Sequence, residues 1–419
     1  MKKENLIVTV AILLITIQAV AVRAAWGDWD PTFAGGLPSL HADTDLFPRS
    51  VAIQPDGKIL VTGYRRSPIS RIGARQMFLL RYLPDGSVDT NFGRNGFATF
   101  SRRGPFEFPQ LRSSSEGERI ALLPDGDIAV SGRAGRDYAV WRFSEDGVAV
   151  MRFGAGGVSK LDYPVTFWPS KIAVQGEKLI VGVVSGPGST APLVVIRLDR
   201  NGRQDSVFGN SGEVNSLVLG QTASMLVETE SGKITIGGLN RAHLRLQAER
   251  LMPDGENDPS FFADHDRPGN IFVTRDLLRL SNEKYVFALD RYQSAFDAPP
   301  HQTMLAIMDT LGGLESQFVF HFEPFVPTVI YAPGILAEQS DGKVIASGHG
   351  TIYVFNSALD PGSAQICDCD PSFIDFSSMT SAVLQPDNKM VAAARQNGTG
   401  NLALIRTLPP TSIKSEDSE

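Results

Sequence analysis

A short turn motif recurs along the chain and restricts the fold more than any other feature of the sequence. Its clearest copy is Gln54-Pro55-Asp56-Gly57-Lys58, which stands between two apolar runs. Further copies follow at residues 123–127, 174–178, 230–233, 281–284, 339–343 and 385–389. Asp-Gly and Asn-Gly supply residues that tolerate positive φ, as tight hairpin turns require. The sequence therefore predicts seven similar β-hairpins in one chain.

Each turn belongs to a longer unit. After the first turn come apolar strands at residues 59–63 and 77–83 and then a second turn, Pro84-Asp85-Gly86. Equivalent positions in successive copies lie 46 to 69 residues apart, with a mean of about 55. Four strands per unit at this period are typical of propeller blades, whereas solenoid repeats are usually shorter. We therefore predict an all-β fold, a seven-bladed β-propeller with four antiparallel strands per blade, over residues 25–410.

The two ends of the repeat region complement each other. The seventh unit ends with its third strand at residues 402–408, followed by two prolines and a polar stretch. A fourth-strand motif occurs instead near the N-terminus, as Asp30-Pro31-Thr32-Phe33. Joining the two would complete the last blade and remove an exposed sheet edge. We predict that the N-terminal strand closes the ring and that residues 411–419 form a disordered polar tail.

Arginines recur at fixed distances from aspartates. Arg81, Arg197 and Arg250 each stand eight residues before an Asp, with a turn midway. Residues equidistant from a hairpin turn face each other across the two strands. The pattern therefore predicts the structural ion pairs Arg81–Asp89, Arg197–Asp205 and Arg250–Asp258, and ring closure adds Arg406–Asp30. Arg142 departs from the pattern because Val150 stands opposite. A ring of arginines that binds a ligand is the alternative interpretation.

The N-terminus has the pattern of an export signal. Lys2 and Lys3 precede an apolar run at residues 6–22, and Val22-Arg23-Ala24 offers the small or apolar residues of a cleavage site. We expect residues 1–24 to be a signal peptide, which predicts an exported protein, periplasmic or secreted, without a membrane span after cleavage. An uncleaved anchor is the alternative, because the apolar run is close to the minimum length of a membrane span.

Composition narrows the class of partner. The 419 residues carry a net charge of -7, with 42% hydrophobic and 20% charged residues, which are values of a globular protein. An acidic balance argues against a nucleic-acid partner, which would require a basic face. We expect a monomer whose partner is a protein or polysaccharide of the cell envelope.

The first repeat carries a family resemblance. Pro-Asp-Gly-Lys at residues 55–58 is followed by Arg81-Tyr82-Leu83-Pro84-Asp85-Gly86-Ser87-Val88-Asp89 and then Asn91-Phe92-Gly93. This order resembles the delta-60 repeat family of bacterial exported proteins. The resemblance extends over about residues 28–408 and fades in the third, fifth and sixth units. It implies a β-propeller of generally unassigned function and transfers no catalytic residue.

A group of arginines is the candidate binding site. Arg65, Arg66, Arg71 and Arg75 lie close together in the long loop of the first unit. On an acidic protein they form a local positive patch that could contact an anionic partner, such as a polysaccharide or a membrane surface. An ordinary solvated loop is the alternative.

Candidate metal ligands are few. Asp264-His265-Asp266 is expected in a loop after the fourth blade, and it would need further ligands from other blades to hold a metal. Cys367 and Cys369 could form a strained disulfide or remain free thiols. Asp368, Asp370 and Asp375 could offer oxygens to calcium, but their spacing matches no calcium loop. We therefore predict no cofactor.

Two classes of function remain. The first is an exported, non-catalytic scaffold that binds a protein or glycan. The alternative is a metal-assisted hydrolase or lactonase with its site in the central channel, and a propeller supports either. An enzyme would need carboxylates or histidines on the innermost strands. The expected strands show mainly apolar and amide residues, near 51–54, 120–123, 172–175, 224–227 and 382–385. The sequence therefore favours binding.

Overall fold

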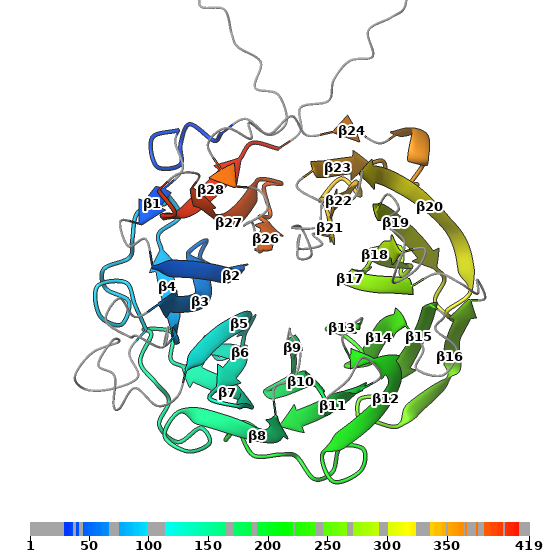
Figure 1. Ribbon diagram of the computed structural model, residues 1–419, viewed down its shortest axis with the longest axis horizontal. Helices are drawn as coiled ribbons and strands as arrows, with labels where there is room; N and C mark the ends of the chain where they lie inside the picture. The colour runs from blue at the N-terminus through cyan, green and yellow to red at the C-terminus, as the bar shows by residue number, and fades with distance from the viewer. Residues whose placement is uncertain are drawn as a thin grey trace, which may run out of the picture.

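Seven antiparallel sheets surround a central axis, which confirms the predicted seven-bladed β-propeller (Figure 1). The structure is a computed structural model. It describes residues 29–36, 39–41, 45–66, 75–98, 114–164, 171–186, 191–220, 223–239, 246–265, 271–292, 301–323, 336–348, 351–363, 365–366, 374–375, 381–396 and 399–409. Within these ranges, no helix has the length and hydropathy needed to cross a membrane.

The first three blades follow one another around the ring. Blade one contains β2 (Leu46–Ile53), β3 (Ile59–Arg66) and β4 (Arg75–Tyr82). Blade two contains β5 (Ser115–Leu122), β6 (Ile128–Ala134), β7 (Asp137–Phe143) and β8 (Val158–Pro164). Blade three contains β9 (Lys171–Gln175), β10 (Lys178–Val184), β11 (Pro192–Leu198) and β12 (Glu213–Leu219). The first strand of each blade lies nearest the axis (Figure 1).

The next three blades repeat this arrangement. Blade four contains β13 (Ser224–Val227), β14 (Ile234–Leu239), β15 (Leu246–Leu251) and β16 (Asn257–His265). Blade five contains β17 (Ile271–Arg279), β18 (Tyr285–Tyr292), β19 (His301–Met308) and β20 (Leu314–Glu323). Blade six contains β21 (Leu336–Glu338), β22 (Val344–Gly348), β23 (Thr351–Phe355), the 3-10 turn η2 (Pro361–Ser363) and β24 (Gln365–Ile366).

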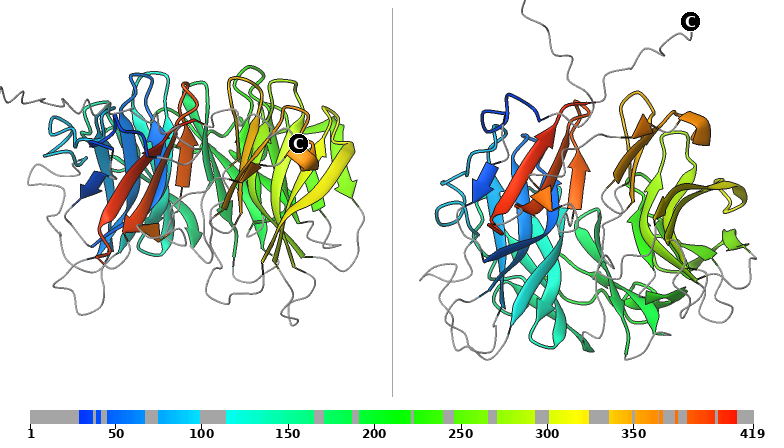
Figure 2. Two further views of the ribbon diagram at one scale, coloured as in Figure 1. Left: turned by 90° about the horizontal axis from the view of Figure 1, so that it is seen from above. Right: turned by 45° about the horizontal axis from the view of Figure 1, so that its top comes forward.

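Blade seven joins the two ends of the chain. It contains β25 (Ile374–Asp375), β26 (Ser381–Leu384), β27 (Met390–Gln396), β28 (Leu402–Thr407) and, from the N-terminal side, β1 (Ser39–His41). Strand β1 pairs antiparallel with β28 through Ser39–Leu404 and His41–Leu402. The two views of Figure 2 show these strands together at one end of the ring. The predicted ring closure is therefore confirmed.

One detail of the closure differs from the sequence prediction. Asp30–Phe33 is a tight turn rather than a strand, because the Phe33 N–H donates to the carbonyl of Asp30 at 3.0 Å. The Asp30 carboxylate also accepts the N–H of Thr32 at 2.9 Å, which stabilises the turn. The segment still reaches blade seven, because the Asp30 N–H donates to the carbonyl of Arg406 at 2.9 Å. The strand itself follows later, as β1.

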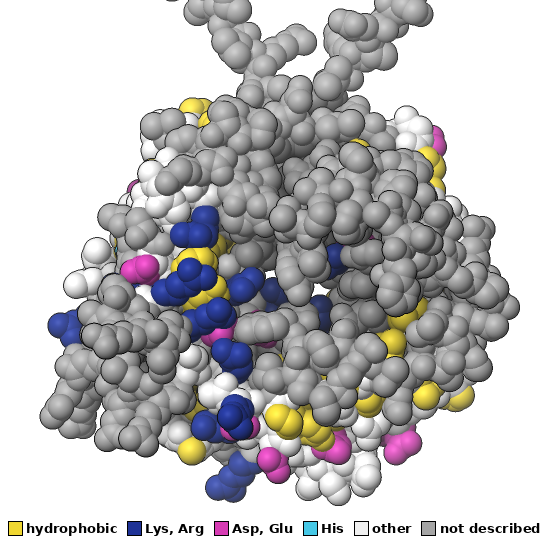
Figure 3. All heavy atoms as spheres, viewed as in Figure 1, with side chains coloured by type: hydrophobic (Ala, Val, Ile, Leu, Met, Phe, Trp, Pro, Cys, Tyr) yellow, Lys and Arg dark blue, Asp and Glu magenta, His cyan; other side chains and the backbone are white. Residues whose placement is uncertain are grey.

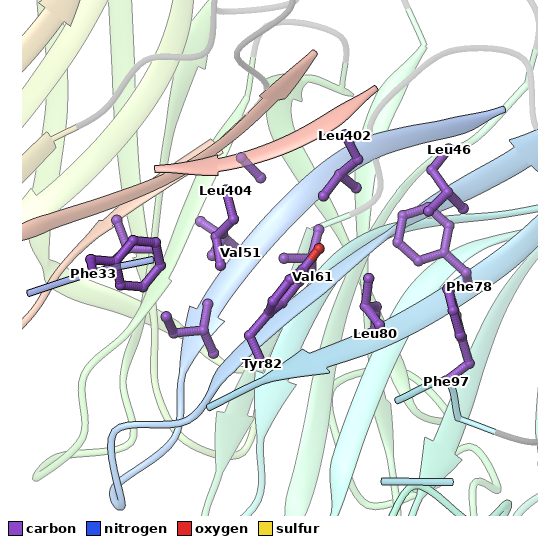
Figure 4. Close-up of a cluster of buried hydrophobic side chains, with 13 residues drawn as sticks. Phe33, Leu46, Val51, Val61, Phe78, Leu80, Tyr82, Phe97, Leu402 and Leu404 are labelled. Carbon is purple, nitrogen blue, oxygen red and sulfur yellow. The ribbon is translucent and has the colours of Figure 1, made fainter. Parts of the chain in front are cut away.

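Apolar residues fill every seam between neighbouring blades. The strands bury both faces, so their sequences are almost continuously apolar, and a separate hydrophobic cluster occupies each of the seven seams. Figure 4 shows the cluster that closes the ring, in which Leu402 and Leu404 of β28 pack against Leu46, Val51 and Phe78 of blade one. Burial of this kind stabilises by about 25 cal/mol per Å² of apolar surface.

The four predicted ion pairs are present, and each arginine also contacts the next blade. The Arg Nε to Asp Oδ2 distances are 2.8 Å for Arg81–Asp89, 2.9 Å for Arg197–Asp205, 2.8 Å for Arg250–Asp258 and 2.7 Å for Arg406–Asp30. The Nη1 atom of each guanidinium donates to a turn carbonyl of the following blade, at Glu145, Pro253, Thr310 and Pro84 respectively. We call this arrangement the arginine clamp. It joins blades as well as strands.

A phenylalanine completes each clamp. The Arg81 guanidinium lies 4.3 Å from the centre of the Phe92 ring, which is fully buried. The other face of the seam is Gly147 of blade two, where a Cβ atom would lie 2.7 Å from the Phe92 ring. Gly147 has a φ of +78°, so the turn itself also favours glycine. The repeated Asp-x-x-Phe-Gly motif therefore fixes the spacing between blades.

Three blades depart from the clamp. Arg142 in blade two turns to the preceding turn and pairs with Asp125 at 2.5 Å and Asp127 at 2.7 Å, which compensates for Val150. In blades five and six the clamp position holds Ile307 and Val354, which pair with β18 and β22 in the register that Arg81 has with β3. The seams that follow blades five and six therefore lack the arginine.

Candidate functional site

The ring has two different rims. The tight turns that link β2 to β3, β5 to β6 and their equivalents all lie on one rim, which we call the turn rim. The opposite ends of the same strands form the other rim. Arg66 ends β3, Arg75 begins β4, and Arg133 and Arg395 lie near the ends of β6 and β27. The fold therefore brings arginines from blades one, two and seven to the rim opposite the turns.

Two stacked aromatic rings organise these arginines. Phe47 of β2 and Tyr64 of β3 lie parallel, with ring centres 4.8 Å apart and an interplanar angle of 4°. The guanidinium carbons of Arg66 and Arg395 lie 4.2 and 4.0 Å from the Phe47 centre. Those of Arg75 and Arg49 lie 4.7 and 5.5 Å from the Tyr64 centre. We call these six residues the arginine cluster. Cation–π contacts hold its guanidinium groups in place.

The cluster carries more positive than negative charge. The buried carboxylate of Glu116 pairs with Arg75 at 3.0 Å and with Arg133 at 2.7 Å, so one acid serves two arginines. Figure 3 shows the Lys and Arg side chains (dark blue) gathered over β2, β5 and β6, with hydrophobic atoms (yellow) among them. Guanidinium groups fixed on aromatic rings suit carboxylate or sulfate groups, which they bind through two parallel hydrogen bonds.

A second group of charges faces the central axis. One residue of each inner strand lies at the same level of the ring, because it pairs with the residue of the second strand that corresponds to Thr62 in β3. The described residues at this level are Ser50, Arg119, Lys171, Ser224, Asp276 and Ser381. Their partners on the second strands are equivalent in register, as in the pairs Arg119–Ser131, Lys171–Gly182 and Asp276–Ala288. We call this set the axial level.

Three inner strands are irregular directly beside this level. The strand pairing shifts by one residue at Arg49 in β2, at Glu118 in β5 and at Arg275 in β17. Each extra residue is a β-bulge, which changes the direction of nearby side chains and is common beside functional sites. In all three bulges the extra residue is charged.

Glu118 and Asp276 neutralise the cations of the axial level only in part. The Arg119 Nη1 atom donates to the carbonyls of Arg49 at 3.2 Å and Glu118 at 3.1 Å. Burial lowers the pKa of Lys171, and the positive charge of Arg119 lowers it further. Burial raises the pKa of Asp276 above its usual range, although its oxygens accept backbone N–H groups from Leu277 at 2.9 Å and Leu336 at 3.1 Å.

The structure brings together part of the predicted site. Arg66 and Arg75 belong to the arginine cluster, and Arg65 lies beside Arg66 at the end of β3. These residues lie on strands and not in a loop, because β3 and β4 extend farther than the apolar pattern suggested. Arg71 lies outside the described residues.

The predicted metal candidates are placed differently. Asp264 and His265 lie in β16, paired with Gln247 and Leu246, so the expected loop position was wrong for both. The outer strand of blade four is long, which extends it into this motif. Asp266, Cys367 and Cys369 lie outside the described residues, as do Asp368 and Asp370, whereas Asp375 lies in β25. Within the described ranges, no three His, Cys, Asp or Glu residues are grouped to hold a metal ion.

Sequence reasoning missed the axial level and four of the six residues of the arginine cluster. The inner strands begin several residues before the apolar segments by which they were recognised, and these first residues include Phe47, Arg49, Arg119 and Lys171. Counting four residues back from the turns reaches Arg119 but then Ser170 and Leu277, so only the strand register identifies Lys171 and Asp276. No sequence signal joins Arg395 to Arg66, because ring closure alone brings them together.

Solved structures share the architecture. A catalytically inactive variant of virginiamycin B lyase from Staphylococcus aureus, with quinupristin, is 10% identical with a TM-score of 0.54, over 89% of this chain and 98% of that one. A protein of unknown function from Dyadobacter fermentans is 11% identical with a TM-score of 0.45, over 88% and 97%. An alpha-L-arabinofuranosidase from Fusarium graminearum is 9% identical with a TM-score of 0.45, over 92% and 97%. At 10% identity the likeness to the lyase shows the fold alone.

Sequence comparison finds similarity over only a short part of the chain. No curated protein sequence matches the chain. One protein family matches residues 54–92, which run from the first turn to Phe92 and include the Arg81–Asp89 clamp. This part of the chain is similar to the family described as a domain of unknown function (DUF5122) beta-propeller.

Proposed function

We propose that this protein is an exported, non-catalytic β-propeller that binds an acidic polysaccharide of the cell envelope through the arginine cluster. We also propose that its units are delta-60 repeats throughout. The observation that carries the binding proposal is the stack of Phe47 and Tyr64 between four guanidinium groups. Phe47 and Tyr64 are direct partners across β2 and β3, which accounts for their stacking, but neither the apolar seams nor the arginine clamps depend on the four guanidinium groups placed over them.

Several features make the arginine cluster suited to an acidic chain molecule. Its guanidinium groups come from three strands of blade one and from β27 of blade seven, so the positive surface extends across a seam. Stacking restricts their side chains before the ligand arrives, which reduces the entropy lost on binding. The protein as a whole carries a net charge of -7, so attraction of a polyanion must be local.

The alternative is the metal-assisted hydrolase or lactonase at the axis. Among the described inner strands, the axial level presents Arg119 and Lys171 beside a single carboxylate, Asp276. Two cations repel a divalent metal ion, whereas they attract an anionic ligand. This arrangement supports binding over metal-assisted hydrolysis. Metal analysis of the purified protein, together with an assay for lactone hydrolysis, would test the alternative.

Binding to immobilised polysaccharides tests the proposal. We expect the mature protein to bind alginate and dextran sulfate but not neutral dextran, with an affinity that falls as salt is added. The Arg66→Glu variant should bind about tenfold more weakly or worse, because it places a carboxylate over Phe47. Biolayer interferometry would measure both effects.

The matched control is Lys58→Glu. Lys58 lies on the turn rim, paired with Asp56, and its replacement changes the net charge by the same amount. We expect this variant to bind like the unmodified protein. Equal losses in Arg66→Glu and Lys58→Glu, or equal binding to neutral dextran, would contradict a specific site at the arginine cluster.

A further inference from the structure

Arg119 and Lys171 lie on the inner strands of neighbouring blades, at the same axial level. Arg119 stands on β5 and Lys171 begins β9, and each pairs with the equivalent residue of its second strand. Like charges in such a position repel each other more strongly than they would in bulk water, because protein atoms surround them. Their proximity therefore costs stability unless something compensates for it.

The described carboxylates compensate for this repulsion only in part. Asp276 and Glu118 attract both cations, but Arg49 adds repulsion at Arg119 and Arg275 adds repulsion at Lys171. Arg119 uses its Nη1 atom for two backbone carbonyls, and its Nε and Nη2 atoms donate to no other described residue. In the part of the chain that the structure describes, the Lys171 ammonium makes no hydrogen bond or ion pair. Asp276 divides its oxygens between these cations and two backbone N–H groups, and Asp290 pairs with Arg275 at 2.5 Å.

The chain also departs from regular structure here. The bulges at Arg49, Glu118 and Arg275 interrupt three inner strands directly beside the axial level. The second and third strands of blades one, two and five pair without such a shift, although the third and fourth strands of blades two and five also contain shifts. Bulges that a sheet does not need for closure often direct side chains toward a ligand.

We propose that a compact oxyanion with two negative charges, such as a phosphate or sulfate group, binds at the central axis between Arg119 and Lys171. Nε and Nη2 of Arg119, which donate to none of the described residues, suit two oxygens of one group, and Lys171 adds a compact positive charge. This site is separate from the arginine cluster, which lies at the rim. It goes beyond the polysaccharide binding proposed above.

Calorimetric titration with inorganic phosphate and with sulfate tests this site, at an ionic strength kept constant with sodium chloride. We expect saturable binding of one anion per chain. The Lys171→Met variant should bind about tenfold more weakly or worse, since it removes one of two cations. Without anion, it should unfold at the same temperature as the unmodified protein or at a higher one, because repulsion from Arg119 is relieved.

Lys178→Met is the matched control. Lys178 is the same type of residue, near the other end of the same hairpin, but it pairs with Asp205 at 2.6 Å. Its replacement should leave phosphate affinity unchanged. Arg119→Met removes the other cation and should also weaken phosphate binding. If one of the two variants fails to fold, the other still tests the site. A phosphate monoester of a sugar, compared with inorganic phosphate, distinguishes a group on a larger ligand from a free ion.

Absence of saturable phosphate and sulfate binding would overturn the proposal, as would unchanged affinity in both Lys171→Met and Arg119→Met. The two proposals of function fail separately. Loss of polysaccharide binding with intact phosphate binding would contradict the role of the arginine cluster alone. Polysaccharide binding without any response to small anions would contradict the axial site alone.

Discussion

A single arginine in the repeat performs three structural tasks. Arg81 pairs with Asp89 in its own blade, donates to the carbonyl of Glu145 in the next and covers the Phe92 ring. Asp30 shows how strongly its surroundings favour the charged carboxylate. Burial alone would raise the pKa of Asp30, but hydrogen bonds from Thr32 and Lys389 and the charge of Arg406 hold that pKa well below its usual range.

Removal of one clamp arginine should destabilise the whole ring. In Arg81→Ala, the buried carboxylate of Asp89 loses its partner, and breaking a buried pair in this way costs about 3–5 kcal/mol. The free energy of unfolding, measured by urea denaturation, should fall by about that amount. The control is Lys343→Ala, in which a half-exposed pair with Asp341 is lost and the change should stay within about 0.5 kcal/mol. Similar values for both variants would contradict the clamp.

For individual residues, the sequence predicted the ion pairs within a blade but not the contacts between blades. The partners Arg81 and Asp89 were predictable because equal distance from a turn places them opposite each other. The acceptor at Glu145 was not, since contacts between blades depend on how the sheets twist against one another. Arg119 and Lys171 were missed for a different reason. They lie just before the apolar segments that indicate the strands, so the apolar pattern does not include them.

The elements of the fold are joined through glycine and phenylalanine. Gly86 and Gly147 receive the rings of Phe33 and Phe92 from the preceding blades, with a Cβ atom excluded at 2.8 and 2.7 Å. The turn that each glycine forms was predicted from the Asp-Gly pair. The packing of a phenylalanine ring from the preceding blade against each glycine could not be predicted, because it depends on the arrangement of the blades.

A comparison of two glycines separates these roles. Gly147→Ala and Gly176→Ala each place alanine at positive φ, which costs about 1–2 kcal/mol in both. Only at position 147 does the new methyl group meet the Phe92 ring, and overpacking adds about 1–3 kcal/mol. Thermal unfolding should therefore show the larger loss for Gly147→Ala. Equal losses would mean that the ring contact does not determine the seam.

The strand order of the elements was predictable, and some boundaries were not. Regular turn spacing indicated seven four-stranded units, because each unit needs its neighbours to bury its apolar faces. The segment Asp30–Phe33 was mistaken for a strand, because the matching segment in other units follows a turn at the same distance. Its Asp and Pro form a turn that precedes β1. The equivalent segment Asp89–Phe92 forms the same turn, because the Phe92 N–H donates to the carbonyl of Asp89 at 3.0 Å, so the N-terminal segment follows the repeat.

The ring as a whole depends on the pairing of β1 with β28. Three contacts join the ends: the β1–β28 ladder, the Asp30–Arg406 pair at 2.7 Å and the buried ring of Phe33. Lys389 adds a second cation at 2.9 Å from Asp30. The seams after blades five and six lack the arginine and contain side-chain hydrogen bonds instead, between Ser281 and Glu338 and between Ser340 and Asn388. The chain ends are therefore joined by the same charged contacts as the other clamped seams.

Deletion of residues 1–41 should destabilise the ring severely. It removes the buried Phe33, which is worth about 3–5 kcal/mol, and leaves Arg406 without Asp30, which costs about as much again. Scanning calorimetry should show a much lower unfolding temperature and aggregation through the exposed β28 edge. Deletion of residues 411–419 is the control and should change neither. An unfolding temperature unaffected by the first deletion would contradict closure by the N-terminal segment.

This way of joining the ends has a consequence for the order of assembly. The segment that carries Asp30 and Phe33 is synthesised before any of the strands that receive it. Blades one to six can therefore form before β28, the partner of β1, has been synthesised. Until then the N-terminal segment stays exposed to solvent. A chain that ends before β28 would fold into a nearly complete ring in which β1 has no partner strand. Such an exposed strand could pair with a second molecule.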